Sequence, residues 1–173
     1  MQAALIAARA GEDRVVEDLL DEAAELAVRV GDGHDHHRTA FGPTAVELAR
    51  VAAAVELGDG PEAVARHENA MGRDGWRWLP VEHRAAHLID AARAYLRTDD
   101  LTTAARVLLR AERIAPAEIR HRPAARDVVA QVARDPAARP RSLSSPSTSG
   151  CCERDGLPAS QSAPGGAQRS AFR

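Results

Sequence analysis

Several kinds of residue are scarce in the sequence or missing from it. Lysine does not occur, so all 23 basic side chains are arginine; aromatic residues make up 3% of the chain; and there are two cysteines. Cys151 and Cys152 are adjacent, so they can form neither a disulfide framework nor a C-x-x-C metal or redox site. No apolar run approaches the roughly 20 residues of a membrane span. These absences exclude a disulfide-rich secreted domain and a membrane-spanning protein, and they indicate a cytoplasmic chain.

A surplus of positive charge is also missing. The formal net charge is −2, and residues 1–134 carry 18 Arg against 22 Asp and Glu. Non-specific binding to nucleic acids needs clustered positive charge, which an acidic segment with mixed signs does not offer. We therefore expect no direct nucleic-acid binding by this chain.

The carboxy-terminal segment 135–173 differs from the rest in composition. Ser, Pro, Gly, Ala and Arg dominate it, and its only large apolar residues are Leu143, Leu157 and Phe172. Such a segment cannot bury enough apolar surface to offset the entropy of ordering its backbone. We predict a disordered tail.

Apolar residues in segment 1–134 recur at intervals of three and four, which is typical of helices, and the alternation typical of strands is missing. With 45% of the chain apolar, there is enough material for a core. Stretches rich in Gly, Pro and Asp separate about seven helical segments. These stretches lie at 9–13, 30–43, 57–62, 71–80, 97–100 and 115–123. We predict one all-α domain at 1–134.

Shifting the sequence against itself shows internal repeats, which are a sign of stacked helical units. A shift of 41 residues pairs Ala63 with Ala104, and a shift of 88 residues pairs Leu20 with Leu108. The domain is therefore predicted to consist of three irregular helix-turn-helix units followed by a final helix.

The third unit shows the repeat spacing most clearly. Its alanines would let paired helices approach closely, its larger side chains would fill the space between units, and its proline would stop the second helix. The positions predicted to pack in this way are Leu88, Ala92, Tyr95, Ala104, Leu108, Ala111 and Pro116. The spacing resembles the tetratricopeptide repeat, and this resemblance implies a right-handed array of stacked helical hairpins.

A narrower resemblance covers most of residues 1–132. It is carried by "HRTAFGPTAVELARVAAAVELGD" at 37–59, "EHRAAHLIDAARAYL" at 82–96 and "VLLRAERIAPAEIRHRPAARDVV" at 107–129. These segments are similar to the carboxy-terminal tetratricopeptide-like region of actinobacterial helix-turn-helix regulators of the Xre type. In that family an amino-terminal module binds DNA and the repeat region senses a ligand or a partner. The resemblance implies a sensory region without its DNA-binding module.

The repeats depart from the usual pattern in two ways. They are 41 to 47 residues apart instead of about 34, and the alignment places Met1 within the first helix of the first unit. Terminal repeats of an array normally carry a polar capping face. We therefore expect further sequence upstream of this chain.

Two groups of histidines contain potential metal ligands. The run "HDHH" at His34–His37 brings three imidazoles and a carboxylate together, but adjacent ligands in one segment rarely complete a tetrahedral site. His83 and His87 share a helix face as in H-E-x-x-H, yet Arg84 stands where that motif needs its glutamate base. We expect no metal, no other cofactor and no catalytic activity.

The first helices of the units line the concave face of such arrays. The tetratricopeptide-like geometry places on that face, or in the connectors beside it, Phe41, Leu48, Ala52, Glu56, Trp76, Trp78, Ile89, Arg93 and Arg97. Arginine binds carboxylates through two hydrogen bonds and aromatic side chains anchor apolar groups, so the groove would suit a peptide. In the alternative interpretation, both arginines pair with acidic residues on a solvent-exposed face, and Trp76 only fills a gap between units.

The sequence thus predicts a non-catalytic module that binds a peptide, a partner protein or a small signalling ligand. Its expected role is the sensory or interaction half of a transcriptional regulator. A free-standing adaptor with no regulatory role is the main alternative, and a histidine-rich metalloenzyme is the third. The sequence leaves the oligomeric state open, a homodimer included.

Overall fold

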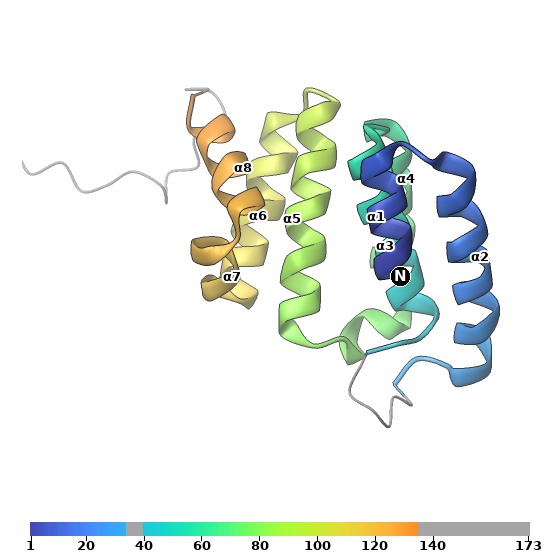
Figure 1. Cartoon of the computed structure of the whole chain (residues 1–173). Coiled ribbons are helices and arrows are strands. Elements are labelled where there is room, and N and C mark those ends of the chain that lie inside the picture. The colour runs from blue at the N-terminus through green and yellow to red at the C-terminus, as the bar shows by residue number, and fades with distance from the viewer. Residues whose placement is uncertain (34–39, 135–173) are drawn as a thin grey trace, which may run out of the picture.

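The computed structural model describes residues 1–33 and 40–134, and every regular element within these ranges is helical (Figure 1). The elements are α1 (Gln2–Ala10), α2 (Asp13–Val30), α3 (Pro43–Leu57), α4 (Gly60–Met71), the 3₁₀-helix η1 (Asp74–Trp78), α5 (Val81–Arg97), α6 (Leu101–Ile114), α7 (Pro116–His121) and α8 (Pro123–Arg134). The all-α prediction is confirmed for the described residues. The histidine run at 34–37 and the expected tail at 135–173 lie outside them.

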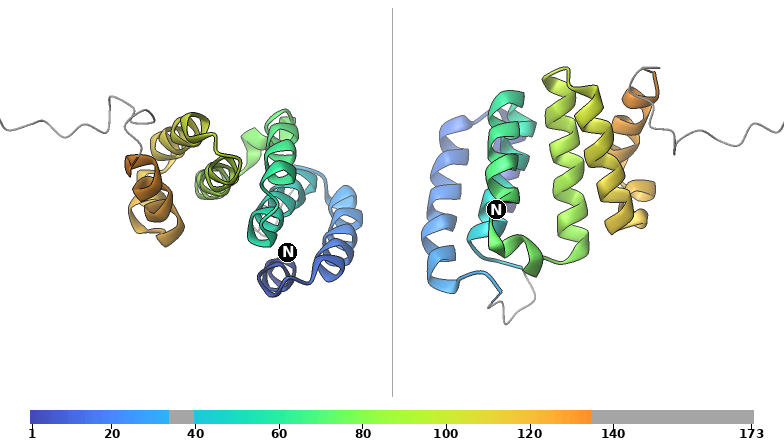
Figure 2. Two further views of the ribbon diagram at one scale, coloured as in Figure 1. Left: turned by 90° about the horizontal axis from the view of Figure 1, so that it is seen from above. Right: turned by 180° about the vertical axis from the view of Figure 1, so that it is seen from behind.

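Consecutive helices pair as hairpins that stack in chain order. Hairpin 1 is α1 with α2, hairpin 2 is α3 with α4, hairpin 3 is α5 with α6, and hairpin 4 is α7 with α8. The first helices also pack on one another, because α1 contacts α3 and α3 contacts α5. As a result, hairpin 1 forms one end of the molecule and hairpin 4 the other (Figures 1 and 2).

The same turn chemistry joins the two helices of hairpins 1, 2 and 3. In each turn a residue with positive φ precedes the acidic N-cap of the second helix. The pairs are Gly11 with Glu12, Gly58 with Asp59, and Asp99 with Asp100. The Asp59 and Asp100 carboxylates accept backbone N–H groups at 3.0 and 2.9 Å. Left-handed backbone favours glycine and acidic caps stabilise helix starts, so these turns are determined by local sequence.

Prolines mark the starts of five helices. Pro43, Pro116 and Pro123 are the first residues of α3, α7 and α8, while Pro61 is the second residue of α4 and Pro80 is the N-cap of α5. A missing N–H is harmless there, because the first N–H groups of a helix have no partner within it.

The structure contains one α-helix more than the sequence predicts in residues 1–134. Segment 115–123, expected to be a connector, contains α7, and the connector 71–80 contains η1. α6 ends at Ile114 and its C-cap Ala115 directly precedes Pro116, as expected of a proline that stops a helix, and Pro116 also begins the next helix. A six-residue helix is shorter than two turns, so it shows too little apolar periodicity to be recognised.

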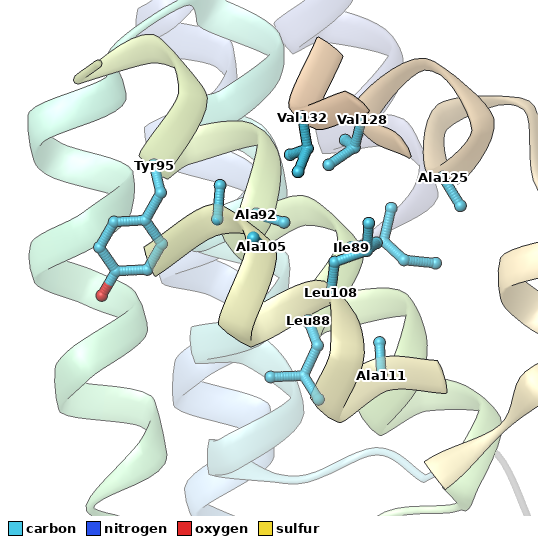
Figure 3. Close-up of a cluster of buried hydrophobic side chains, with 11 residues drawn as sticks. Leu88, Ile89, Ala92, Tyr95, Ala105, Leu108, Ala111, Ala125, Val128 and Val132 are labelled. Carbon is cyan, nitrogen blue, oxygen red and sulfur yellow. The ribbon is translucent and has the colours of Figure 1, made fainter. Parts of the chain in front are cut away.

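The largest core cluster lies between α5, α6 and α8 (Figure 3). Its buried members are Leu88, Ile89, Ala92, Tyr95, Ala104, Ala105, Leu108, Ala111, Ala125, Val128 and Val132. Ala92, Ala104 and Ala111 are completely inaccessible to solvent. Small side chains at these positions let α5 and α6 pack closely over their whole length. Six of the seven positions selected by the repeat spacing thus lie in this cluster, and the exposed Pro116 does not.

The connectors on either side of hairpin 2 meet at one carboxylate. Asp32 accepts hydrogen bonds from the backbone N–H of Thr44 at 3.0 Å and from its hydroxyl at 2.6 Å, which holds the start of α3. Gly75 of η1 packs on the same two residues, and a Cβ atom at this position would collide with both of their side chains. Residue 75 must therefore be glycine for the two connectors to approach.

Candidate functional site

An open groove of about 400 Å³ lies across the first helices of hairpins 1, 2 and 3. Its apolar lining comes from each of them in turn: Leu5 of α1, Leu48 and Ala49 of α3, and Ala86 of α5, with Leu79 just before α5. The first-helix contacts described above bring these residues together, although up to 81 positions separate them in the sequence. The groove is thus a product of the stacking and belongs to no single hairpin.

The polar part of the groove lies on α5. His83, His87 and Asp90 line it at successive turns of that helix, and Arg122 closes one side from the segment between α7 and α8. Arg122 is engaged by Glu118, four residues earlier. The groove therefore combines an apolar wall on α1 and α3 with a polar row on α5.

His87 of this row forms a buried pair with a second histidine. His67 of α4 and His87 of α5 are 6% and 4% exposed, and Nδ1 of His67 lies 2.8 Å from Nε2 of His87. This distance is that of a hydrogen bond, so one ring donates and the other accepts. Nδ1 of His87 is buried and has no hydrogen-bond partner among the described residues. The hydrogen bond between the two histidines is a buried polar contact that joins α4 of hairpin 2 to α5 of hairpin 3.

The surroundings of the pair favour uncharged imidazoles. Burial lowers the pKa of His67 to about 4, and the Arg110 charge acts in the same direction. Burial lowers the pKa of His87 to about 3, with further contributions from His67 and Arg110. Both rings also make edge contacts with aromatic side chains, His67 with Tyr95 and His87 with Trp76. Both histidines are therefore neutral near pH 7.

A chain of ion pairs spans α1, α3 and α5 beside the groove. Arg93 Nη1 donates to Glu56 at 2.9 Å and to Asp90 at 3.2 Å, and Arg9 lies 3.5 Å from Glu56. Burial acts to raise the pKa of Glu56, but the hydrogen bond and charge of Arg93 hold it below its usual value. Burial raises the pKa of Asp90 despite its contact with Arg93. Side chains of opposite charge therefore pair across the first helices of the three hairpins.

The residues predicted to line one groove lie at several different places in the structure. Leu48 lines the groove, whereas Ile89 is 1% exposed and belongs to the core. Glu56 and Arg93 bind each other, which is the ion pairing of the alternative interpretation. Arg97 lines a different cavity, between α5 and α8. Ala52, although half-buried on α3, is not among the residues lining any described cavity.

The connector aromatics lie in two places, neither of them in the groove. Phe41 and Trp78 line a cavity of about 300 Å³ at the ends of the hairpins. Trp76 packs against the main core cluster, and the Arg110 guanidinium lies 5.8 Å from the centre of its ring. Trp76 thus packs on hairpin 3 and is not among the residues that line the groove.

His67 was not predicted from the sequence, although a usable signal was present. A shift of 47 residues pairs Leu20 with His67, and a shift of 41 pairs His67 with Leu108, so a histidine stands where the other hairpins have a core leucine. A polar residue at a core position needs a partner. The sequence instead paired His87 with His83, which the structure leaves exposed.

Within residues 1–33 and 40–134 no group of three or more His, Cys, Asp or Glu side chains is arranged to hold a metal ion. In the same ranges no helix has the length and apolar character needed to cross a membrane. Comparison with protein-family models, with curated proteins and with solved structures finds no match to this chain.

Proposed function

We propose that this chain is a non-catalytic helical-repeat interaction module that binds an apolar peptide segment, from a partner protein or on its own, in the groove over α1, α3 and α5. The observation that carries the proposal is the groove itself, which three consecutive first helices line with Leu5, Leu48 and Ala86. Concave faces built by first helices are the usual binding surfaces of helical-repeat proteins. A small signalling ligand of apolar character would fit the same volume.

The recurrence of the hairpins supports a tetratricopeptide-like arrangement. Hairpins 1, 2 and 3 share the positive-φ residue followed by an acidic N-cap, and their first helices pack on one another. Buried alanines stand at equivalent places in them, as with Ala63 and Ala104. These features account for the alanine spacing that first pointed to the repeat.

Apolar contact, more than charge, would select the ligand. Arg93, the residue expected to hold an anionic group, already binds Glu56 and Asp90. An anionic ligand would have to displace two carboxylates from it, whereas the apolar lining is open. Leucine-type side chains placed at helical spacing would match a groove that runs across three helices.

Peptide selection tests this function directly. Displayed random peptides are selected on the immobilised full chain, and the affinities of recovered peptides are measured by fluorescence anisotropy. In Ala86→Glu a longer charged side chain enters the groove, while glutamate keeps the helix propensity close to that of alanine. Ala130→Glu places the same change on the exposed side of α8 and serves as the matched control.

We expect Ala86→Glu to weaken binding at least about tenfold, which corresponds to roughly 1.4 kcal/mol, and Ala130→Glu to bind like the parent. If the peptides bind Ala86→Glu as tightly as they bind the parent, the binding site lies outside the groove. Failure to enrich any peptide would count against the proposal itself.

The resemblance to Xre-type regulators adds a biological role to this module. We propose that it is the sensory half of a cytoplasmic transcriptional regulator, with a free-standing adaptor as the alternative. The coding sequence upstream of Met1 distinguishes the two. An in-frame helix-turn-helix module supports the regulator, and its absence supports the adaptor.

A further inference from the structure

The end of the molecule formed by hairpin 1 exposes most of the large apolar side chains found at the surface. Of the eight large hydrophobic residues that the structure exposes in its described part, six lie within residues 1–30. They are Met1, Ile6, Val15, Leu26, Val28 and Val30. Isolated apolar residues are normal at protein surfaces, but their concentration on one hairpin marks an interaction surface.

Equivalent positions in hairpins 2 and 3 show how this surface differs from theirs. Ile6, Ala53 and Ala94 each stand five residues before the positive-φ residue that ends their hairpin's first helix. Ala53 is 2% exposed and packs against hairpin 1, and Ala94 is inaccessible and packs against hairpin 2. Ile6 occupies the same position and is 65% exposed. The position that hairpins 2 and 3 bury against the preceding hairpin is therefore exposed on hairpin 1 in the described part of the chain.

Neighbouring positions extend this surface over both helices of hairpin 1. On α1, Ala3 and Ala10 lie on the side of Ile6 and are exposed. On α2, Val15, Leu19, Leu26 and Val30 follow one another at intervals of four, seven and four residues, which places them along one side of the helix. We call these seven residues the N-terminal end face. Hairpin 1 lies at the end of the stack in all views (Figure 2).

The opposite end of the described structure is polar. The exposed residues of α8 include Arg126, Asp127, Gln131 and Arg134, and no large apolar side chain is exposed on α7 or α8. Apart from a cavity of about 170 Å³ lined by Leu109, Ile119 and Val129, a second copy of the chain finds no exposed apolar surface at hairpin 4. It finds one at the N-terminal end face of its partner, because that face is apolar on both copies.

We infer that two copies of this chain associate through their N-terminal end faces, Ile6 of each packing against hairpin 1 of the other. A contact between identical faces requires a two-fold axis, which closes the assembly at a dimer. In the dimer the second copy's hairpin 1 covers the face of Ile6, but in a two-fold related orientation that differs from the head-to-tail stacking of hairpin 2 on hairpin 1. Hairpin 4 of each copy then points away from the axis.

The size of the face sets the expected strength. α2 has 18 residues, so it is about 27 Å long, and two helices side by side are about 20 Å wide, which gives roughly 500 Å² per copy. The pair would bury about 1,000 Å² in total, at the lower limit for a specific interface. A reversible dimer with a dissociation constant in the micromolar range follows from these dimensions.

Sedimentation velocity of the full chain across the micromolar range tests this inference. Ile6→Glu places a charge at the centre of the face and should leave the fold unchanged, because the side chain is exposed. Val28→Glu makes the same change at a residue that is 74% exposed on another side of α2. Circular dichroism spectra establish that both variants keep the helical content of the parent.

We expect a concentration-dependent monomer–dimer equilibrium for the parent and Val28→Glu, and a dissociation constant raised at least about tenfold for Ile6→Glu. A parent that stays monomeric throughout the range would overturn the inference, as would an Ile6→Glu variant that dimerises like the parent. Assemblies that grow beyond the dimer would show head-to-tail stacking and would overturn it as well.

Discussion

Replacing the buried histidine pair with apolar residues should remove most of the acid sensitivity of this fold. The double variant His67→Leu, His87→Val installs residues that the other hairpins use at equivalent positions. Leu20 and Leu108 correspond to His67, and Val46, which is 1% exposed, corresponds to His87. Both partners must change together, because a single replacement would leave the remaining imidazole buried without a partner.

The magnitude follows from the pKa values. In the unfolded chain both imidazoles titrate near 6.5, whereas in the folded chain their pKa values are about 4 and about 3. Below the unfolded value the unfolded chain therefore binds protons that the folded chain does not, so stability falls as the pH falls. Between pH 7 and pH 5 the loss is about 2 kcal/mol per histidine and roughly 4 kcal/mol for the pair. This is a large part of a typical domain stability of about 5–15 kcal/mol.

The other charged and aromatic groups around the pair do not mask this effect. Burial raises the pKa of Tyr95 of α5, so this side chain remains neutral throughout the interval. The pKa of Glu56 is held below its usual value by Arg93, so this group contributes mainly below pH 5. Burial raises the pKa of Asp90, which acts in the opposite direction on acidification. Asp90 is present in the parent, the control and the double variant alike, so the difference between them isolates the histidines.

Urea unfolding followed by circular dichroism at both pH values measures the difference. The parent and the control His83→Gln, which changes an exposed histidine on the same helix, should lose similar stability on acidification. The double variant should lose little. An equal loss in the parent and the double variant would refute the assignment of His67 and His87 as the acid-sensitive groups.

Three further outcomes are expected. Ala92→Leu should lower the free energy of unfolding in urea by about 1–3 kcal/mol, because the alanine is inaccessible between packed helices. Ala117→Leu on the exposed side of α7 should change it by less than about 0.5 kcal/mol. The reverse ranking would contradict the packing of hairpin 3. Arg93→Ala should lower the free energy of unfolding by about 1–3 kcal/mol, since it removes the partner of two partly buried carboxylates. Arg106→Ala at an exposed position should lower it by less than about 0.5 kcal/mol. Equal effects would show that the ion pairs of Arg93 do not stabilise the fold. In mobility-shift assays at physiological salt the chain should give no sequence-specific complex with DNA. A specific shift would refute the inference, drawn from the acidic balance of residues 1–134, that this chain does not bind nucleic acid.

The helices and their turns could be predicted from the sequence because short-range rules determine them. Gly58 with Asp59, and Asp99 with Asp100, carry the left-handed residue and the acidic cap at adjacent positions, so a window of a few residues is enough. α7 escaped prediction for the opposite reason. Its six residues are too few for a periodic pattern, and its starting proline was interpreted as the end of α6.

The site was harder to predict, because it depends on how helices rotate against each other. A small rotation of α5 decides whether Ile89 or its neighbour Asp90 faces the groove, and the apolar spacing of the helix does not distinguish the two positions. Ile89 is in the core and Asp90 lines the groove. Arg93 shows the same limit: its position on α5 could be predicted, but its engagement by Glu56 depends on the approach of α3.

The junction at Asp32 bears on how the molecule unfolds. In a stack whose units touch mainly their neighbours, each unit can open separately, and unfolding then proceeds from an end inwards. Here a single carboxylate holds Thr44 at the start of hairpin 2 and lies against Gly75 at the entrance to hairpin 3. Detaching hairpin 3 would disturb the contact at Gly75 and with it the anchoring of α3, so the free energies of opening hairpins 2 and 3 are coupled. Hairpin 4 takes no part in this junction, so its opening is not coupled to the other two through Asp32.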